Sequence, residues 1–364
     1  MSELTNPFMH FQITKDYRQE SKVEHKLPDI ILLTICGVLL GHDGWDGIID
    51  FGNAHFEAGI SSADTLSRVM GMISPVALQR SFIAWMKDCH SLTNSEVNAI
   101  DGKTLRGSYD RSKGKGAIHM VNAFATANGM IIGQQKVDSK SNEITAIPKL
   151  LDLLYVKGCL VTIDVMGCQR SIAKEIVERG GDYLMSVKSN QPCLHALFES
   201  KFAFDKLAEY AAQAVEQEEV GKRGRKMLRK YITVPFEQKY GDFSVDWKEL
   251  KTLCIAVTYQ RDNHELSGSM GIRYFISSKE LTPSGFGQLC RGHCGVESMH
   301  WWLDAVMNED DSRITYKHAS ENLSRIRQMC MNFIKLVEMK GTLKRRQLKY
   351  ALNTEFRERV LFGD

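Results

Sequence analysis

Two short apolar runs, each ending in an aspartate with a glycine soon after, constrain the fold of this chain most. Residues 98–107 read Asn-Ala-Ile-Asp-Gly-Lys-Thr-Leu-Arg-Gly, and Asp101 ends the run. Residues 160–169 read Leu-Val-Thr-Ile-Asp-Val-Met-Gly-Cys-Gln, and Asp164 ends the run. Buried strands that end at the same edge of an open α/β sheet bring the residues after them together. We therefore expect Asp101 and Asp164 to lie close to each other.

Taken alone, Asp101 has a second interpretation, because Asp-Gly is one of the commonest turn dipeptides. The run that ends at Asp164 favours the site interpretation. Two neighbouring carboxylates repel each other unless a cation or a proton lies between them. The pair therefore predicts either a divalent metal or a raised carboxyl pKa.

Composition excludes several classes of protein. The 364 residues are 43% hydrophobic and 25% charged, which is typical of a globular protein of two or three domains. A net charge of +3 is too small to predict a polyanion partner by itself. Nine cysteines without a Cys-x-x-Cys pair favour a reducing cytoplasm. Residues 27–40 are apolar but shorter than the roughly 20 residues of a membrane span, so we expect a buried helix and no membrane segment.

The order of patterns along the chain predicts several segments. Residues 1–95 read as helical, and they fit either plain helix packing or a DNA-reading helix-turn-helix. Residues 96–190 alternate strands and helices, with a hairpin at Asn128-Gly129 and a helix whose first turn is expected to hold Pro148. Residues 192–283 read as a mostly β insertion with a basic loop at 221–230. Residues 284–340 read as helical, with Glu297 beside an apolar stripe, and 341–364 as a basic, peripheral tail.

Several strings, in this order, resemble the H-repeat-associated insertion-sequence transposases, which belong to the DDE superfamily. The strings are Ile-Asp-Gly-Lys-Thr-Leu-Arg-Gly at 100–107, Lys-Ser-Asn-Glu-Ile-Thr-Ala-Ile-Pro at 140–148, Thr-Ile-Asp at 162–164, Gly-Cys-Gln at 167–169, Gly-Gly-Asp-Tyr at 180–183, Val-Glu at 296–297, His-Trp at 300–301 and Asn-Glu-Asp-Asp at 308–311. The resemblance spans nearly the whole chain. It departs from the family pattern at Ala63, Val165, Ser189 and Cys294, and none of these departures removes an acid of the presumed site.

The resemblance implies an α/β fold: a ribonuclease H-like mixed sheet flanked by helices, with a β-rich insertion (192–283) before the last catalytic helix. It implies an all-helical N-terminal domain (1–95), a catalytic domain (96–340) and a basic tail (341–364). Carried over residue by residue, Asp101 resembles the first catalytic acid, Asp164 the second and Glu297 the third. Glu309, within the family-like Asn-Glu-Asp-Asp run, is the rival third acid.

The implied activity is divalent-metal-dependent cleavage and strand transfer of DNA. Carboxylates without an organised Cys or His set favour two Mg²⁺ or Mn²⁺ ions over zinc. A zinc site of Cys290, His293, Cys294 and His300 is the weaker alternative, because its spacing matches no familiar finger. The expected partner is double-stranded DNA, at element ends and at the target, bound by a dimer. The expected DNA contacts are Lys103, Arg106, Lys188, Asn190, Gln191, Lys222, Arg223, Arg225 and Lys226. A catalytically decayed DNA-binding protein and a small-molecule phosphohydrolase remain alternatives.

Overall fold

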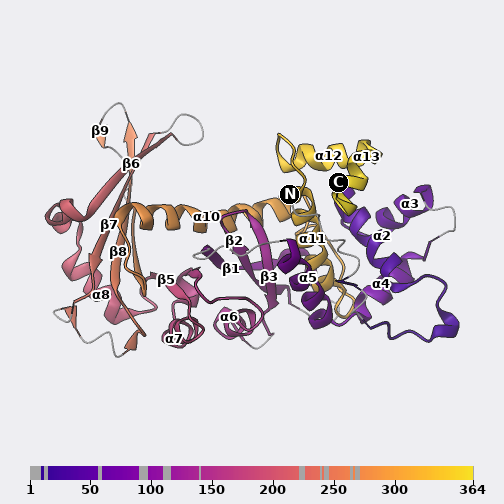
Figure 1. The fold of residues 1–364 in the computed structure, drawn as a ribbon, viewed down its shortest axis with the longest axis horizontal. Helices are drawn as coiled ribbons and strands as arrows, with labels where there is room; N and C mark the ends of the chain where they lie inside the picture. The colour runs from indigo at the N-terminus through magenta and orange to yellow at the C-terminus, as the bar shows by residue number, and fades with distance from the viewer. Residues whose placement is uncertain are drawn as a thin grey trace.

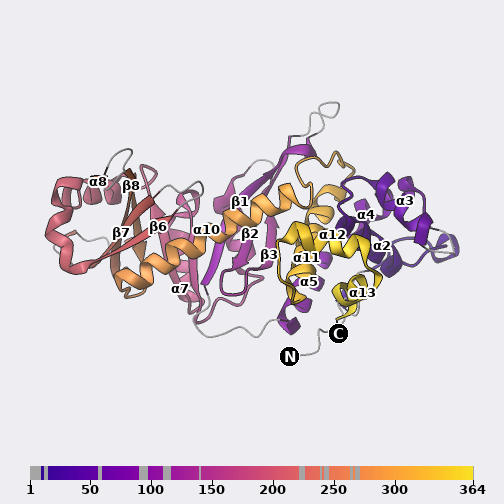
Figure 2. The ribbon, with the colours of Figure 1, turned by 90° about the horizontal axis from the view of Figure 1, so that it is seen from above.

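The computed structural model describes residues 10–11, 15–55, 60–89, 97–109, 116–138, 141–220, 226–237, 240–241, 246–262, 265–266 and 271–363. These residues form an elongated molecule (Figure 1). Strands β6, β7 and β8 lie at one end, and helices α2, α3 and α4 lie at the other (Figure 2).

A mixed sheet forms the centre of the molecule. Its strands are β1 Val97–Leu105, β2 Ile118–Ala125, β3 Met130–Lys136, β4 Leu160–Ile163, β5 Asp182–Val187, β6 Ala214–Val220, β7 Lys226–Pro235, β8 Thr252–Asp262, β9 Glu265–Leu266 and β10 Gly271–Ser277. They are ordered β3-β2-β1-β4-β5-β10-β8-β7-β6, and β9 pairs with β8. Strands β4 and β5 run parallel to β1, whereas β2 and β3 form the antiparallel hairpin predicted at Asn128-Gly129.

Helices cover both faces of this sheet. The described α-helices, some of which lie beyond the sheet, are α2 Leu27–Leu40, α3 Trp45–His55, α4 Ala63–Met72, α5 Pro75–Cys89, α6 Glu143–Leu151, α7 Arg170–Glu178, α8 Pro192–Lys201, α10 Pro283–Ala305, α11 Ala319–Leu336, α12 Leu343–Leu352 and α13 Thr354–Phe362. Successive residues of a strand point to opposite faces. Accordingly, Ile100 packs in the core under α6 and α7, and Ala99 packs in the core that includes α11. The mixed sheet flanked by helices confirms the predicted ribonuclease H-like class.

The long helix α10 crosses the sheet and positions one side of the site (Figure 2). It begins at Pro283, where the Thr282 side chain accepts a hydrogen bond from the backbone N–H of Gly285, as an N-cap residue does. Phe286, Cys290 and Val296 are buried against strands beneath it. The stripe predicted for this segment is therefore the face that packs on the sheet.

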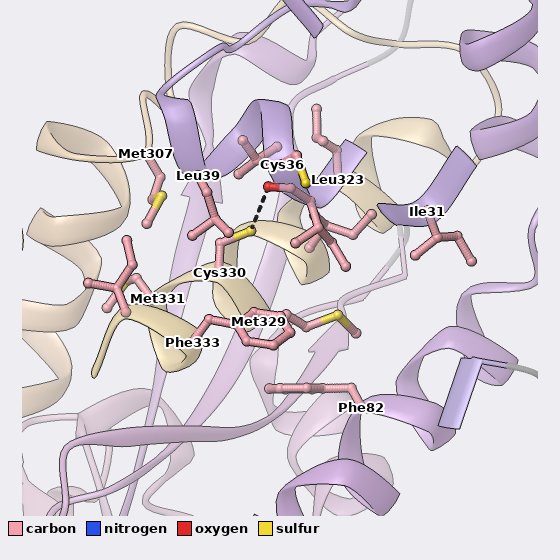
Figure 3. Close-up of a cluster of buried hydrophobic side chains, with 14 of the residues drawn as sticks. Ile31, Cys36, Leu39, Phe82, Met307, Leu323, Met329, Cys330, Met331 and Phe333 are labelled. Atoms are coloured by element: carbon pink, nitrogen blue, oxygen red, sulfur yellow. Dashed lines mark hydrogen bonds between the residues drawn. The ribbon is translucent and has the colours of Figure 1, made fainter. Parts of the chain in front are cut away.

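The N-terminal helices do not have a core of their own. They pack around α11, which is buried from Ala319 to Ile334. Figure 3 shows Ile31, Leu39 and Phe82 around the Met and Phe side chains of α11, where the Cys330 thiol donates to the Ile35 carbonyl at 3.6 Å. The described N-terminal helices and helices α11 to α13 thus share one apolar cluster.

Three local expectations differ from the structure. Strand β1 continues through Asp101 to Leu105, because β2 goes on pairing with it after β4 has ended. Pro148 is the sixth residue of α6, beyond its first turn. The predicted β-rich insertion is confirmed: strands β6, β7, β8 and β10 follow α8 and extend the central sheet. Residues 341–364 are not peripheral, since α12 and α13 bury Tyr350 and Phe356.

Among the described helices, none is by itself long and apolar enough to cross a membrane. The bent pair α2 and α3 passes the same test by length and composition. Ten of the fourteen residues of α2 are buried inside the protein.

Candidate active site

Asp101 and Asp164 lie side by side on neighbouring strands. In the parallel pairing of β1 with β4, Ile100 is the partner of Ile163, and each aspartate is the next residue. Strand β4 ends there and turns into a short 3₁₀ helix, Val165–Gly167. The sequence pattern therefore predicted the proximity of the two acids correctly, although only β4 ends at its aspartate.

The surroundings of Asp101 disfavour its negative charge. Burial, followed by the nearby carboxylates of Asp164, Glu143 and Glu297, raises the pKa of Asp101 to about 7. The backbone N–H of Gly102 opposes this by donating to Oδ1 at 2.8 Å. The direction of this shift agrees with the raised carboxyl pKa expected for paired acids, and burial is its largest cause.

Glu297 reaches the same region from α10. Together with Asp164 it lines a cavity of about 170 Å³ between α10 and strands β4, β5 and β10. Lys188 and Arg273 supply positive charge to the wall of this cavity. His293 lines it too, and its Nδ1 lies 2.8 Å from the Thr162 hydroxyl. The pKa of His293 lies below its ordinary value, because burial lowers it by more than the charge of Asp164 raises it.

Glu309, the rival third acid, lies in a different cluster. Its side chain is buried, and Oε2 lies 2.8 Å from the Lys103 ammonium nitrogen. Lys103 also donates to Asp304 at 2.7 Å and to Asp310 at 3.3 Å. Glu309 additionally accepts from the Ser324 hydroxyl at 2.8 Å. The structure thus groups Glu297, rather than Glu309, with the two aspartates.

The position of Lys103 in this cluster contradicts the prediction that Lys103 contacts DNA. Its side chain is 7% exposed, and three carboxylates that lie about 200 positions later in the chain hold its ammonium group. A lysine in this position cannot reach a phosphate without breaking those pairs. Arg106, by contrast, has a side chain that is 83% exposed, with Nε 3.5 Å from Asp310.

The remaining predicted DNA contacts divide into three groups. Lys188 is exposed and lines the cavity beside Asp164. The side-chain amides of Asn190 and Gln191 donate to the carbonyls of Val165 and Cys168, both at 2.8 Å, so they hold the turn that follows Asp164. Lys222, Arg223 and Arg225 fall outside the described residues, and Lys226 begins β7.

Glu143 is a fourth acid that sequence reasoning did not identify as a site residue. It begins α6 behind the N-cap Asn142, and its Oε1 accepts from His119 Nε2 at 2.7 Å. A Cβ at Gly102 would lie 2.1 Å from this same oxygen, so the carboxylate sits against the backbone beside Asp101. Its position in the family-like string at 140–148 was the available signal.

His300 of α10 also faces Asp101 and was not predicted to do so. Its Nδ1 lies 3.6 Å from Asp101 Oδ2, and its Nε2 accepts from the Asn122 side-chain amide at 3.1 Å. Burial, together with the charge of Lys103, lowers the pKa of His300 to about 3. The ring is therefore neutral at physiological pH.

The donor chemistry fits a hard divalent cation better than zinc. Within the described residues, no group of three or more His, Cys, Asp or Glu side chains is gathered closely enough to hold one ion. The zinc alternative is not supported, because the Cys294 thiol donates to the Cys290 carbonyl and His293 and His300 have partners of their own. Asp101, Asp164 and Glu297 supply only carboxylate oxygens, the ligands that Mg²⁺ and Mn²⁺ prefer.

Comparison with known proteins identifies the family. The model described as "Transposase DDE domain" matches residues 93–333, and the model described as "DDE_Tnp_1-associated" matches residues 8–86. "Putative transposase YncI" of Escherichia coli O157:H7 is 44% identical over 97% of this chain and 93% of its own length. "H repeat-associated putative transposase YhhI" of Escherichia coli K12 is 44% identical over 99% of both chains. The chain therefore belongs to the DDE transposase family.

Proposed function

We propose that this protein cleaves DNA at the ends of an insertion-sequence element and joins those ends to a target, using Asp101, Asp164 and Glu297. The observation that carries the proposal is the convergence of three acids: Asp101 and Asp164 follow the paired residues of β1 and β4, and Glu297 lines the same cavity as Asp164. The raised pKa of Asp101 agrees with this arrangement. Neighbouring carboxylates repel one another, and a bound cation would offset this repulsion.

Asp101 and Asp164 would hold two Mg²⁺ or Mn²⁺ ions, and Glu297 would complete the set. When bound, these ions supply Lewis-acid activation of the attacking oxygen and stabilise the leaving oxygen at phosphorus. In cleavage the attacking oxygen belongs to water, and in strand transfer it belongs to a DNA 3′-hydroxyl. Each reaction forms one P–O bond and breaks another, so one site serves both.

The positive groups near the acids support a polymeric substrate. Lys188 and Arg273 lie on the cavity wall with Asp164 and Glu297. Arg106 is exposed and directly follows β1, the strand that carries Asp101. We propose that these side chains contact DNA phosphates, with the basic segment 222–226 as a further contact. The protein would act in the cytoplasm as a dimer assembled on double-stranded DNA.

A cleavage assay on the element's own terminal repeats tests the proposal. Asp101→Asn, Asp164→Asn and Glu297→Gln should each abolish Mg²⁺- or Mn²⁺-dependent nicking while gel-shift affinity for the same DNA is kept. Glu178→Gln is the matched control, because Glu178 is an exposed acid on α7. Nicking at the wild-type rate by any of the three variants would refute the assignment. Binding without nicking by the wild-type protein would favour a catalytically decayed DNA-binding protein.

A further inference from the structure

A chain of three side chains links the core of the protein to Asp101. Gln328 of α11 donates its Nε2 amide to Oδ1 of Asn122 at 2.7 Å, and both residues are fully buried. Asn122 of β2 is the register partner of Asp101 on β1. The Asn122 amide nitrogen lies 3.1 Å from His300 Nε2, and His300 Nδ1 lies 3.6 Å from Asp101 Oδ2.

The direction of these hydrogen bonds fixes the tautomer of the ring. Because Gln328 donates to the Asn122 oxygen, the Asn122 amide nitrogen is the group that faces His300, and it can only donate. His300 Nε2 must then accept, which leaves the proton of the neutral ring on Nδ1. If both amides were reversed, the bare lone pair of Nδ1 would face Oδ2 of Asp101, and this arrangement is repulsive when the carboxylate is ionised, as it must be to bind a cation.

The proton on Nδ1 points at the oxygen of Asp101 that lacks a backbone partner. Oδ1 already accepts from the Gly102 N–H at 2.8 Å, whereas Oδ2 faces the imidazole. The 3.6 Å separation is longer than a hydrogen bond, and contacts of this kind commonly shorten when the site is loaded. Groups that orient a ligand in this way affect metal affinity or activity strongly.

We propose that His300 is a positioning residue for Asp101, held by Asn122 and Gln328 with its proton on Nδ1. This inference rests on the proposed function, in which Asp101 is a catalytic acid. When the contact shortens in the loaded site, His300 would donate to Asp101 without adding a charge. It would restrict the rotation of the carboxylate and leave the negative charge available to a cation.

Two substitutions of His300 test the contacts of its two ring nitrogens separately. His300→Asn keeps a donor near the position of Nδ1 and loses the contact with Asn122. His300→Gln keeps a group near Nε2 and removes the donor that faces Asp101. We expect His300→Gln to need about 10–100-fold more Mn²⁺ for half-maximal cleavage, and His300→Asn to come closer to wild type. His318→Gln is the matched control, since His318 is exposed at the start of α11.

Nuclear magnetic resonance of the wild-type protein tests the tautomer without DNA, metal or activity. Nitrogen-15 shifts should show a protonated Nδ1 and an unprotonated Nε2 for His300. A proton on Nε2, or equal loss in the two variants at matched thermal stability, would overturn the inference. If the wild-type protein failed to nick DNA but showed the Nδ1 proton, the proposed function would fail and the placement of His300 would stand.

Discussion

Replacing Asp101 with Asn should stabilise the metal-free protein at alkaline pH. Asp101 has a side chain that is 23% exposed, and folding raises its pKa from the ordinary 3.8 to about 7. At about 1.4 kcal/mol for each unit of pKa, ionised Asp101 costs folding at most about 4 kcal/mol. Asn carries no charge, so we expect Asp101→Asn to gain at least about 1 kcal/mol, a typical size for one substitution.

The effect has a defined pH window. Between pH 3.8 and about 7 the folded chain binds its proton at Asp101 while the unfolded chain has lost it. The contribution of this residue to stability therefore falls as pH rises through the window, which is opposite to the behaviour of a carboxylate paired with a cation. Below the window Asp101→Asn should match the wild type, and above it the variant should be more stable.

Urea unfolding from pH 4 to pH 8, without divalent ions, measures this difference. Asp138→Asn is the control. Asp138 is exposed, its carboxylate lies 2.7 Å from the Lys149 ammonium nitrogen, and Lys149 lowers the pKa of Asp138. Above the pKa of Asp138, the free energy of unfolding of Asp138→Asn should be lower than that of the wild type or equal to it. Adding Mn²⁺ should reduce the difference in the free energy of unfolding between the wild type and Asp101→Asn. An Asp101→Asn variant that is less stable than wild type at pH 8 would refute the electrostatic argument.

Three further predictions follow from other contacts. Glu143→Gln removes a negative charge next to Asp101 and should lower the pKa of Asp101, as read from its side-chain carbon-13 shift against pH; an unchanged pKa would contradict the contact. Lys103→Met leaves Asp304, Glu309 and Asp310 without their shared cation and should cost about 3–5 kcal/mol in urea unfolding, whereas a loss below about 1 kcal/mol would show that the cluster is solvated. Lys188→Ala should reduce the slope of log affinity for DNA against log salt by about one, and an unaltered slope would remove Lys188 from the interface.

Local patterns predicted the parts of the site that lie on single elements. The runs before Asp101 and Asp164 form adjacent parallel strands, and the stripe from Phe286 to Val296 forms the helix that carries Glu297. These patterns are set by neighbours along the chain, so the sequence displays them directly.

Contacts between distant segments were not predictable from such patterns. Lys103 was expected at a phosphate, but its three partners come from residues 304–310. The extension of β1 past Asp101 depends on pairing with β2, and the position of β10 beside β5 depends on the whole sheet. Asn122 and His300 face Asp101 because β2 and α10 meet there, a result that their own sequence neighbourhoods do not contain.

The central claim is that Asp101, Asp164 and Glu297 bind the metal ions that activate DNA cleavage. The most direct measurement is an anomalous difference map at the manganese edge, from crystals of the full chain grown with Mn²⁺ and element-end DNA. The account predicts peaks in contact with the carboxylates of Asp101 and Asp164, close to Glu297. Peaks bound by Glu309 would contradict it. The absence of peaks near Asp101 in crystals whose DNA has been cleaved would also contradict it.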